Sequence, residues 1–154
     1  CIFDFLIGNT DRHQSNWALI SRNGKMRLSP LYDNSSSLCA YVTEPKIERY
    51  LGNDLMLWKS LVDTKSKSII RINCQDTKQP THLEVVKYIR QNYFEQTVNI
   101  VKKIEELLTE DEICIIMDKH IELLSMKKID LIKKYLFSKV QLLKEVYGEV
   151  NYEP

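Results

Sequence analysis

The 154-residue sequence has little glycine and proline, with four of each, and it contains no G-x-G motif. A glycine-rich loop is the usual cover for nucleotide phosphates, and no segment of this chain predicts one. No run of about 18 apolar residues occurs, so no membrane span is predicted. A charged segment followed by an apolar one, typical of a signal peptide, is also missing, and we expect no such peptide.

An excess of one charge is missing as well. Lys and Arg together number 22 and Asp and Glu number 21, which gives a formal net charge of +1. Nucleic acids and membrane surfaces usually select a basic excess, so we expect neither as a direct partner. The four cysteines form no C-x-x-C pair, and the three histidines are scattered. We therefore expect free thiols in a reducing cytoplasm and no zinc site.

The hydrophobic content of 44% suits one domain with a real core. The sequence starts at Cys1 and continues directly into the apolar stretch CIFDFLIG. We therefore expect a piece of a longer protein whose N-terminal part is absent. Gly8 favours the end of a helix over residues 2–7, although a buried strand fits nearly as well.

Residues 16–33 are typical of a β-hairpin, with NWALIS and MRLSPLYD as its arms. Asn23-Gly24 between them is the strongest short hairpin signal, because a type I′ turn needs positive φ at both positions. Closing the hairpin at Arg22 and Lys25 pairs Leu19 with Leu28, Trp17 with Pro30 and Asn16 with Leu31. Pro30 then falls on a non-hydrogen-bonded pair, where its missing N–H is tolerated.

The rest of the chain is predicted to be mostly helical. We expect residues 39–79 to be an irregular connecting segment, with a short helix near 55–62 and a strand or extended piece at 68–73. Residues 80–154 predict a helical subdomain, since Thr81 and Thr109 each precede a glutamate by three residues, as in a capping box. Apolar stripes of helical period follow both. The fold class is thus mainly α with a small β-hairpin.

The loop before the hairpin carries the residues with chemical potential. Asp11 and Asn16 form D-x-x-x-x-N, the core of a kinase catalytic loop, in which Asp is the base and Asn binds Mg²⁺. A kinase also needs a metal carboxylate at the end of the following hairpin, and Asp33 stands there. In the predicted register Asp33 and Asn16 share one face, with Cα atoms roughly 7–8 Å apart. The alternative is that these residues only form turns.

The stretches FLIGNTDRHQSNWALI and MRLSPLYDNSSSL resemble the C-terminal lobe of HipA-like kinases, most strongly over residues 2–38. These are bacterial Ser/Thr kinases with a protein-kinase-like fold, and many are toxins of toxin–antitoxin pairs. The resemblance implies that Asp11 is the catalytic base and that Asn16 and Asp33 bind Mg²⁺. It places His13 and Tyr32 in stretches that approach the phosphates of ATP. It also implies a small helix-turn-helix antitoxin as a partner.

Several residues keep two interpretations. D-R-H-x-x-N also resembles phosphoinositide-type kinases, and the roles of Arg12 and His13 stay open. His13 either stabilises phosphoryl charge or shapes the loop through a backbone hydrogen bond. Residues 35–37, all serines, form either an activation-like loop or simple turns. His82 and His120 are expected to be structural.

The resulting hypothesis is an ATP- and Mg²⁺-dependent kinase of protein Ser/Thr, with residues 1–38 as catalytic loop and metal-binding hairpin. The N-terminal lobe and its nucleotide clamp are expected to be absent, so residues 1–154 alone should transfer phosphate poorly. Asp33 is followed by Asn34, so D-F-G is missing. The alternatives are a lipid or small-molecule phosphotransferase, against which the near-neutral charge argues mildly, and a silent pseudokinase that docks a partner.

Overall fold

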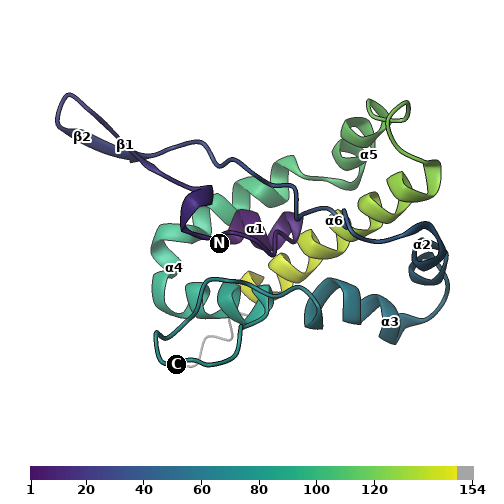
Figure 1. Ribbon diagram of the computed structural model, residues 1–154, viewed down its shortest axis with the longest axis horizontal. Helices are drawn as coiled ribbons and strands as arrows, with labels where there is room; N and C mark the ends of the chain where they lie inside the picture. Colours follow the sequence, from purple (N-terminus) through teal and green to yellow (C-terminus); the bar gives the residue numbers. More distant parts are fainter. Residues whose placement is uncertain (149–154) are drawn as a thin grey trace.

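A computed structural model describes residues 1–148 (Figure 1). Helices dominate, and one antiparallel pair of strands is present, which confirms the predicted fold class. The elements in chain order are α1 (Ile2–Ile7), the 3-10 turn η1 (Gln14–Asn16), β1 (Leu19–Arg22), β2 (Lys25–Leu28), α2 (Glu44–Leu51), α3 (Leu55–Lys59), the π turn η2 (Ser60–Thr64), α4 (His82–Leu107), α5 (Glu110–Asp118) and α6 (Met126–Gly148). Residues 149–154, assigned above to the helical subdomain, lie outside the described residues. No helix within residues 1–148 is long and apolar enough to cross a membrane.

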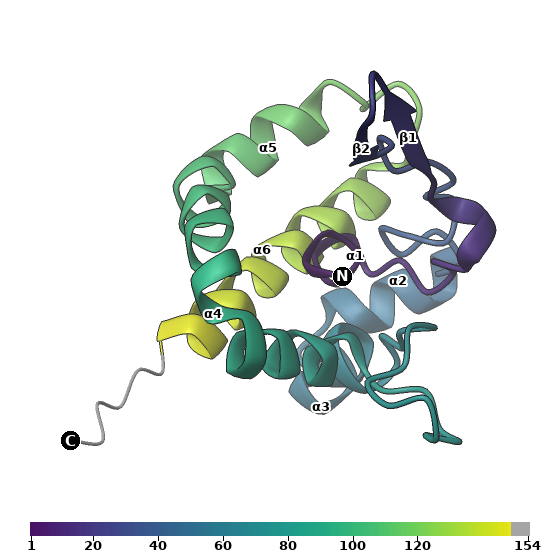
Figure 2. The ribbon, with the colours of Figure 1, turned by 90° about the vertical axis from the view of Figure 1, so that its left-hand side faces the viewer.

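Helix α6 is the common support of the fold, because its side chains enter three apolar clusters. The short helix α1 is enclosed between α4 and α6 (Figure 2). Its Phe5 is completely buried and packs in one cluster with Val86 of α4 and Leu143 of α6. A second cluster joins α5 to α6, and a third joins α2 to α6. The hydrophobic burial that fixes α1, and with it the start of the predicted catalytic loop, is therefore shared with α4 and α6.

The predicted helix starts in the second half are confirmed. Thr81 and Glu84 form a reciprocal capping box at the start of α4, and the Thr109 hydroxyl caps α5. The apolar stripe predicted after Thr81 belongs to α4, which is kinked at Tyr93. The Asn92 amide donates to the Tyr88 carbonyl over 2.8 Å, and such side-chain insertion beside the helix ladder accompanies sharp kinks.

The connecting segment 39–79 is more regular than predicted. It contains the expected helix near 55–62, as α3 and η2, and also α2, which the sequence reasoning missed. The local signal for α2 was present and was overlooked, because Pro45 lies in its first turn and Ile47, Tyr50 and Leu51 stand at helical spacing. Residues 68–73 form no strand, and the neighbouring Lys67 makes a single bridge to Thr81. The four cysteines are free thiols, as predicted.

The hairpin is confirmed at its turn and corrected at its base. Asn23 and Gly24 have φ of 53° and 71°, and the ladder pairs Leu19 with Leu28 through Arg22 with Lys25. The predicted pairs Trp17–Pro30 and Asn16–Leu31 do not form, because Asn16 belongs to η1. The Ser29 hydroxyl accepts the Ala18 N–H over 3.2 Å, and Pro30 has no N–H to extend the ladder.

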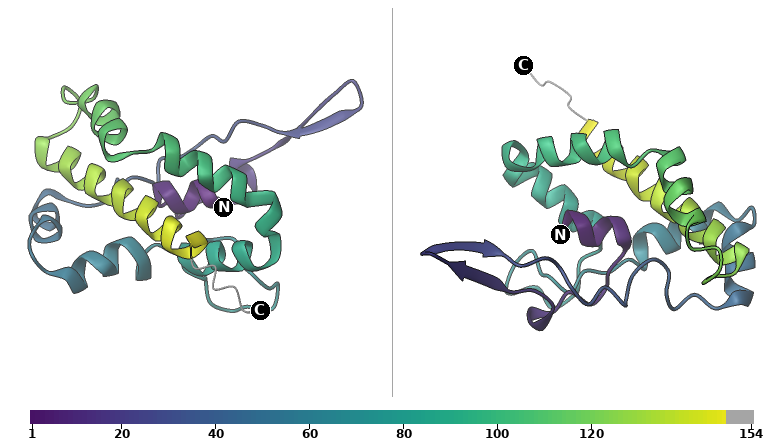
Figure 3. Two further views of the ribbon diagram at one scale, coloured as in Figure 1. Left: turned by 180° about the vertical axis from the view of Figure 1, so that it is seen from behind. Right: turned by 90° about the horizontal axis from the view of Figure 1, so that it is seen from above.

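The hairpin register therefore does not bring Asn16 and Asp33 together, contrary to the prediction. Asn16 and Asp33 are not strand residues, so strand parity does not place them on one face. The hairpin itself extends away from the helical body (Figures 1 and 3). Of its eight strand residues only Ile20 is even partly buried, and Met26 is 67% exposed. The contacts that join the segments of the predicted site residues are therefore made at the base of the hairpin, next to the helices.

Candidate active site

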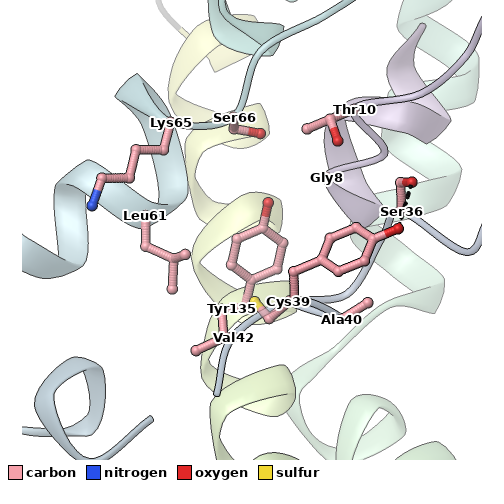
Figure 4. A pocket seen from close by; sticks show the side chains of 11 residues that line it. Gly8, Thr10, Ser36, Cys39, Ala40, Val42, Leu61, Lys65, Ser66 and Tyr135 are labelled. Carbon is pink, nitrogen blue, oxygen red and sulfur yellow. Dashed lines mark hydrogen bonds between the residues drawn. The ribbon is translucent and has the colours of Figure 1, made fainter. Parts of the chain in front are cut away.

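The predicted catalytic loop starts with a sharp turn at Gly8, which ends α1 with φ 65° and ψ 37°. An added Cβ here would lie 2.1 Å from the Tyr135 hydroxyl oxygen of α6. Gly8 is therefore required both by its left-handed backbone and by the approach of α6. Figure 4 shows the cavity of about 190 Å³ at this point, lined by the hydroxyl groups of Thr10, Ser36, Ser66 and Tyr135 among other side chains.

A buried ion pair lies below the loop. The Arg12 Nε donates to the Asp4 carboxylate of α1 over 2.9 Å, and the Asn9 amide donates to the same oxygen over 3.3 Å. All three residues are at most 5% exposed. A buried pair is costly to break, since removing one partner leaves the other charge without solvent or counterion. Asp4, the one acidic residue in the apolar stretch IFDFLI, thus ties the loop to α1.

Arg12 also joins the loop to the segment that follows the hairpin. Its NH1 group donates to the carbonyl oxygens of Asn16, over 2.8 Å, and of Tyr32, over 2.7 Å. Its NH2 group donates to the side-chain oxygen of Asn34. One guanidinium therefore holds Asn16 close to the chain on both sides of Asp33. The convergence that sequence reasoning attributed to strand register comes instead from this buried arginine.

Asp11 is held through its backbone on both sides. The Asn9 side-chain oxygen accepts the Asp11 N–H over 3.1 Å, and the Asn16 amide nitrogen donates to the Asp11 carbonyl over 2.8 Å. The Asp11 side chain stays partly exposed, while Asn16 is buried. With its nitrogen engaged, Asn16 offers its amide oxygen for coordination of a cation. The predicted metal ligand Asn16 thus holds the backbone of the predicted base Asp11.

Asp33 is exposed and has a φ of 50°, in the left-handed region that few non-glycine residues adopt. Its carboxylate accepts the Ser35 hydroxyl over 2.8 Å. Backbone strain of this kind is frequent at functional sites. The carboxylate is accessible, and the Arg12 contacts to its two neighbours fix the backbone that carries it.

His13 makes the backbone hydrogen bond that one of its two interpretations requires. Its Nδ1 accepts the Ser15 N–H over 3.2 Å and caps η1. Tyr32 contributes its carbonyl to Arg12, and its side chain is 44% exposed. The serines act as turn formers, since the Ser37 hydroxyl donates to the Asn34 carbonyl and the Ser36 carbonyl accepts the Thr10 N–H over 3.3 Å.

A second buried polar group, which sequence reasoning did not anticipate, lies behind the loop. It consists of Ser66, His82, Tyr135 and Lys139, and Lys139 is 0% exposed. Burial, reinforced by the charge of Lys139, lowers the pKa of His82 to about 4. Burial also lowers the pKa of Lys139 to about 7. The signal was present in the sequence, because Lys139 interrupts the apolar stripe of α6 four residues from both Tyr135 and Leu143.

The donor set suits a hard cation. Mg²⁺ takes oxygen ligands and is usually held by one or two carboxylates together with substrate phosphates. The Asn16 amide oxygen and the Asp33 carboxylate meet this description. Residues 1–148 contain no group of three or more His, Cys, Asp or Glu side chains that could hold a metal by themselves. The loop and the Asp33 segment, which Arg12 joins, therefore each supply an oxygen donor of the kind that Mg²⁺ takes.

Comparisons with known proteins agree with this architecture. The sequence matches the family model of the HipA-like C-terminal domain over residues 1–110, and the chain belongs to this family. The structure is similar to the crystal structure of CtkA, a proinflammatory kinase of Helicobacter pylori, with a TM-score of 0.75 and 18% sequence identity. The match covers 96% of this chain and 51% of that chain, so this chain spans about half its length. No curated protein matches the sequence.

Proposed function

We propose that this chain carries the catalytic base and the metal ligands of an ATP- and Mg²⁺-dependent kinase that phosphorylates Ser or Thr of a protein. Membership of the HipA-like family and structural similarity to a protein described as a kinase support this proposal. The observation that carries it is the Arg12 guanidinium, which joins the loop of Asp11 and Asn16 to the backbone around Asp33.

Phosphoryl transfer needs little covalent chemistry from the protein, and positioning with charge neutralisation is most of the catalysis. Asp11 accepts the proton of the attacking hydroxyl, from a backbone held by Asn9 and Asn16. Asn16 and Asp33 hold Mg²⁺, which when bound neutralises charge on the transferred phosphate. His13 and Tyr32 face the phosphate side in this proposal, with His13 Nδ1 already engaged by Ser15.

The proposed kinase needs parts that this chain does not supply. No G-x-G motif occurs in this chain, so a phosphate-covering loop must come from another part of the whole protein. Residues 1–154 alone are accordingly expected to transfer little phosphate. A protein substrate and a small helix-turn-helix antitoxin are the proposed macromolecular partners.

The test uses the full-length protein with labelled ATP and separate protein, lipid and aminoglycoside pools. Asp11→Asn and Asp33→Asn should each lower kcat about 100-fold or more, as expected for loss of a catalytic base or a metal ligand. Asp76→Asn is the matched control, because Asp76 is an exposed turn residue that accepts the Asn73 N–H.

Full activity of both site variants would contradict the assigned site. Label confined to the lipid or aminoglycoside pool would instead favour the small-molecule phosphotransferase. Absence of label in all pools, with the protein folded, would favour a partner-docking module without catalysis.

A further inference from the structure

We infer that the cavity beside the predicted catalytic loop receives one uncharged, apolar side chain of the protein substrate, close to the serine or threonine that is phosphorylated, and so selects substrates by sequence. This inference rests on the proposed function, because it names what the same site recognises. The cavity has a volume of about 190 Å³ and lies between the loop, the segment after Asp33 and α6 (Figure 4).

The walls of the cavity belong to the two segments that carry the candidate site. Thr10 directly precedes the predicted base Asp11, and Ser36 follows the predicted metal ligand Asp33 by three positions. The Thr10 N–H donates to the Ser36 carbonyl over 3.3 Å, so the two walls are joined by a direct hydrogen bond. An extended peptide advances by only about 3.3–3.6 Å per residue. A substrate residue within a few positions of the reacting hydroxyl can therefore reach the cavity.

The wall contributed by the chain after the hairpin is fixed before any ligand binds. The Leu38 N–H donates to the Ile7 carbonyl of α1 over 2.7 Å. The Lys128 ammonium group of α6 donates to two carbonyls of this wall, those of Cys39 and Val42. Leu38 and Cys39 have φ of 49° and 58°, in the left-handed region that is costly for non-glycine residues and frequent at functional sites. A preformed cavity binds a side chain without the cost of ordering its own walls.

Among the side chains within residues 1–148 that line the cavity, none presents an ionised group to it. Lys65 turns its ammonium group away from the cavity (Figure 4) and donates to the Tyr50 hydroxyl over 3.4 Å. Burial raises the pKa of the Cys39 thiol to about 11, and burial also raises the pKa of the Tyr135 hydroxyl, so both groups are neutral near pH 7. An ionised substrate side chain would lose water here without gaining a counterion.

Several of the hydroxyl groups that line the cavity are already engaged with the protein. The hydroxyl oxygens of Ser36 and Tyr41 lie 3.3 Å apart, and Ser66 Oγ accepts from the Lys139 ammonium group over 3.1 Å. Aliphatic side chains, among them Leu61 of η2, complete the lining. An apolar pocket with a few polar groups is the usual form of a binding site for an uncharged group.

The volume of the cavity limits the size of its occupant. An apolar cavity of about 150 Å³ holds benzene. The present cavity of about 190 Å³ therefore accepts the side chain of valine, leucine, methionine or phenylalanine. The indole of tryptophan is about half as large again as benzene and exceeds it. We expect kcat/KM about tenfold higher for leucine than for tryptophan, aspartate or lysine at one position near the phosphorylated residue.

The test uses the full-length protein and a peptide library with one fixed serine, in which each flanking position is varied in turn. Leu61→Ala enlarges the cavity and should raise the ratio of kcat/KM for tryptophan peptides to that for leucine peptides about tenfold. Leu57→Ala is the matched control, because Leu57 is also half-buried and packs in the same apolar cluster but does not line this cavity. It should leave the ratio unchanged.

A second variant changes the cavity in the opposite direction. Ala40 lines the cavity from an exposed position, so Ala40→Leu narrows it without disturbing the core. This variant should shift the preference from leucine to alanine at the same peptide position. It keeps the inference testable if Leu61→Ala does not fold.

A library without a preferred flanking position, or equal ratios in Leu61→Ala and Leu57→Ala, would overturn the inference and leave the proposed function intact. If the wild-type protein labels no protein or peptide, the proposed function fails. Binding of leucine and aspartate peptides, measured by fluorescence anisotropy, then decides by itself whether the cavity takes an apolar side chain.

Discussion

The predicted catalytic loop and the hairpin that follows it each contain a glycine with positive φ, but the surroundings of the two glycines differ. Gly8 and Gly24 have nearly equal φ, 65° and 71°. Gly8 turns the chain onto a buried polar layer of Asp4, Asn9 and Arg12, whereas Gly24 lies in a turn with no other atom within 4 Å of an added Cβ. Local backbone preference is therefore enough to place the hairpin turn, whereas the predicted catalytic loop depends on tertiary contacts for its conformation.

The largest expected effect comes from breaking the buried ion pair. Arg12→Met takes the guanidinium from the buried Asp4 carboxylate and leaves only the terminal ammonium of Cys1, at 3.5 Å from the other oxygen, so we expect a loss of about 3 kcal/mol in the free energy of unfolding. Arg22→Met, at the exposed end of β1, should change it by no more than about 0.5 kcal/mol. Chemical denaturation of both variants measures the difference. A small loss in Arg12→Met would show that the loop is stabilised elsewhere.

A comparable or smaller effect is expected from the two glycines. Gly8→Ala combines an unfavourable left-handed backbone with a clash against Tyr135, and should cost about 3 kcal/mol. Gly24→Ala has only the unfavourable left-handed backbone and no clash, and should lower the free energy of unfolding by about 1 kcal/mol. Thermal and chemical unfolding of the two variants test this. Equal losses would mean that α6 moves away from the loop at little cost.

The smallest effect concerns acid stability. Because the pKa of His82 is lowered from 6.5 to about 4 in the folded state, the unfolded chain binds more protons between these values. The stability contribution is complete above about pH 6.5 and is lost as pH falls toward 4. Between pH 7 and 5 the wild type should lose about 2 kcal/mol more than His82→Gln. Parallel pH profiles of unfolding would contradict the buried environment of His82.

Much of the fold could be predicted because its signals are local. Thr81 and Thr109 mark helix starts through side chains that bond to nearby backbone N–H groups. Asn23-Gly24 fixes the hairpin turn and its first four pairs. The helix α2 was missed although Ile47, Tyr50 and Leu51, which pack toward α6, stand at helical spacing, because the pattern lasts for only eight residues.

The residues of the candidate site could be selected from the sequence, but the contacts that join their segments could not. Asp11, Asn16 and Asp33 were selected from their spacing, and the structure joins their segments through Arg12, whose role the sequence left open. The ladder that was expected to align them ends at Leu19 and Leu28. No local rule connects Asp4 with Arg12 or Lys139 with Ser66, since these contacts span 8 and 73 positions.

The sequence by itself determined the helical class, the hairpin turn and the family to which the chain belongs, because capping residues, turn residues and apolar period act within a few positions. Only the tertiary structure decided how the loop is held. Burial removes water from Asp4, Arg12, His82 and Lys139, and in that environment each polar group must find a partner inside the fold. The partners that it finds place Asp11 and Asn16 beside the segment of Asp33.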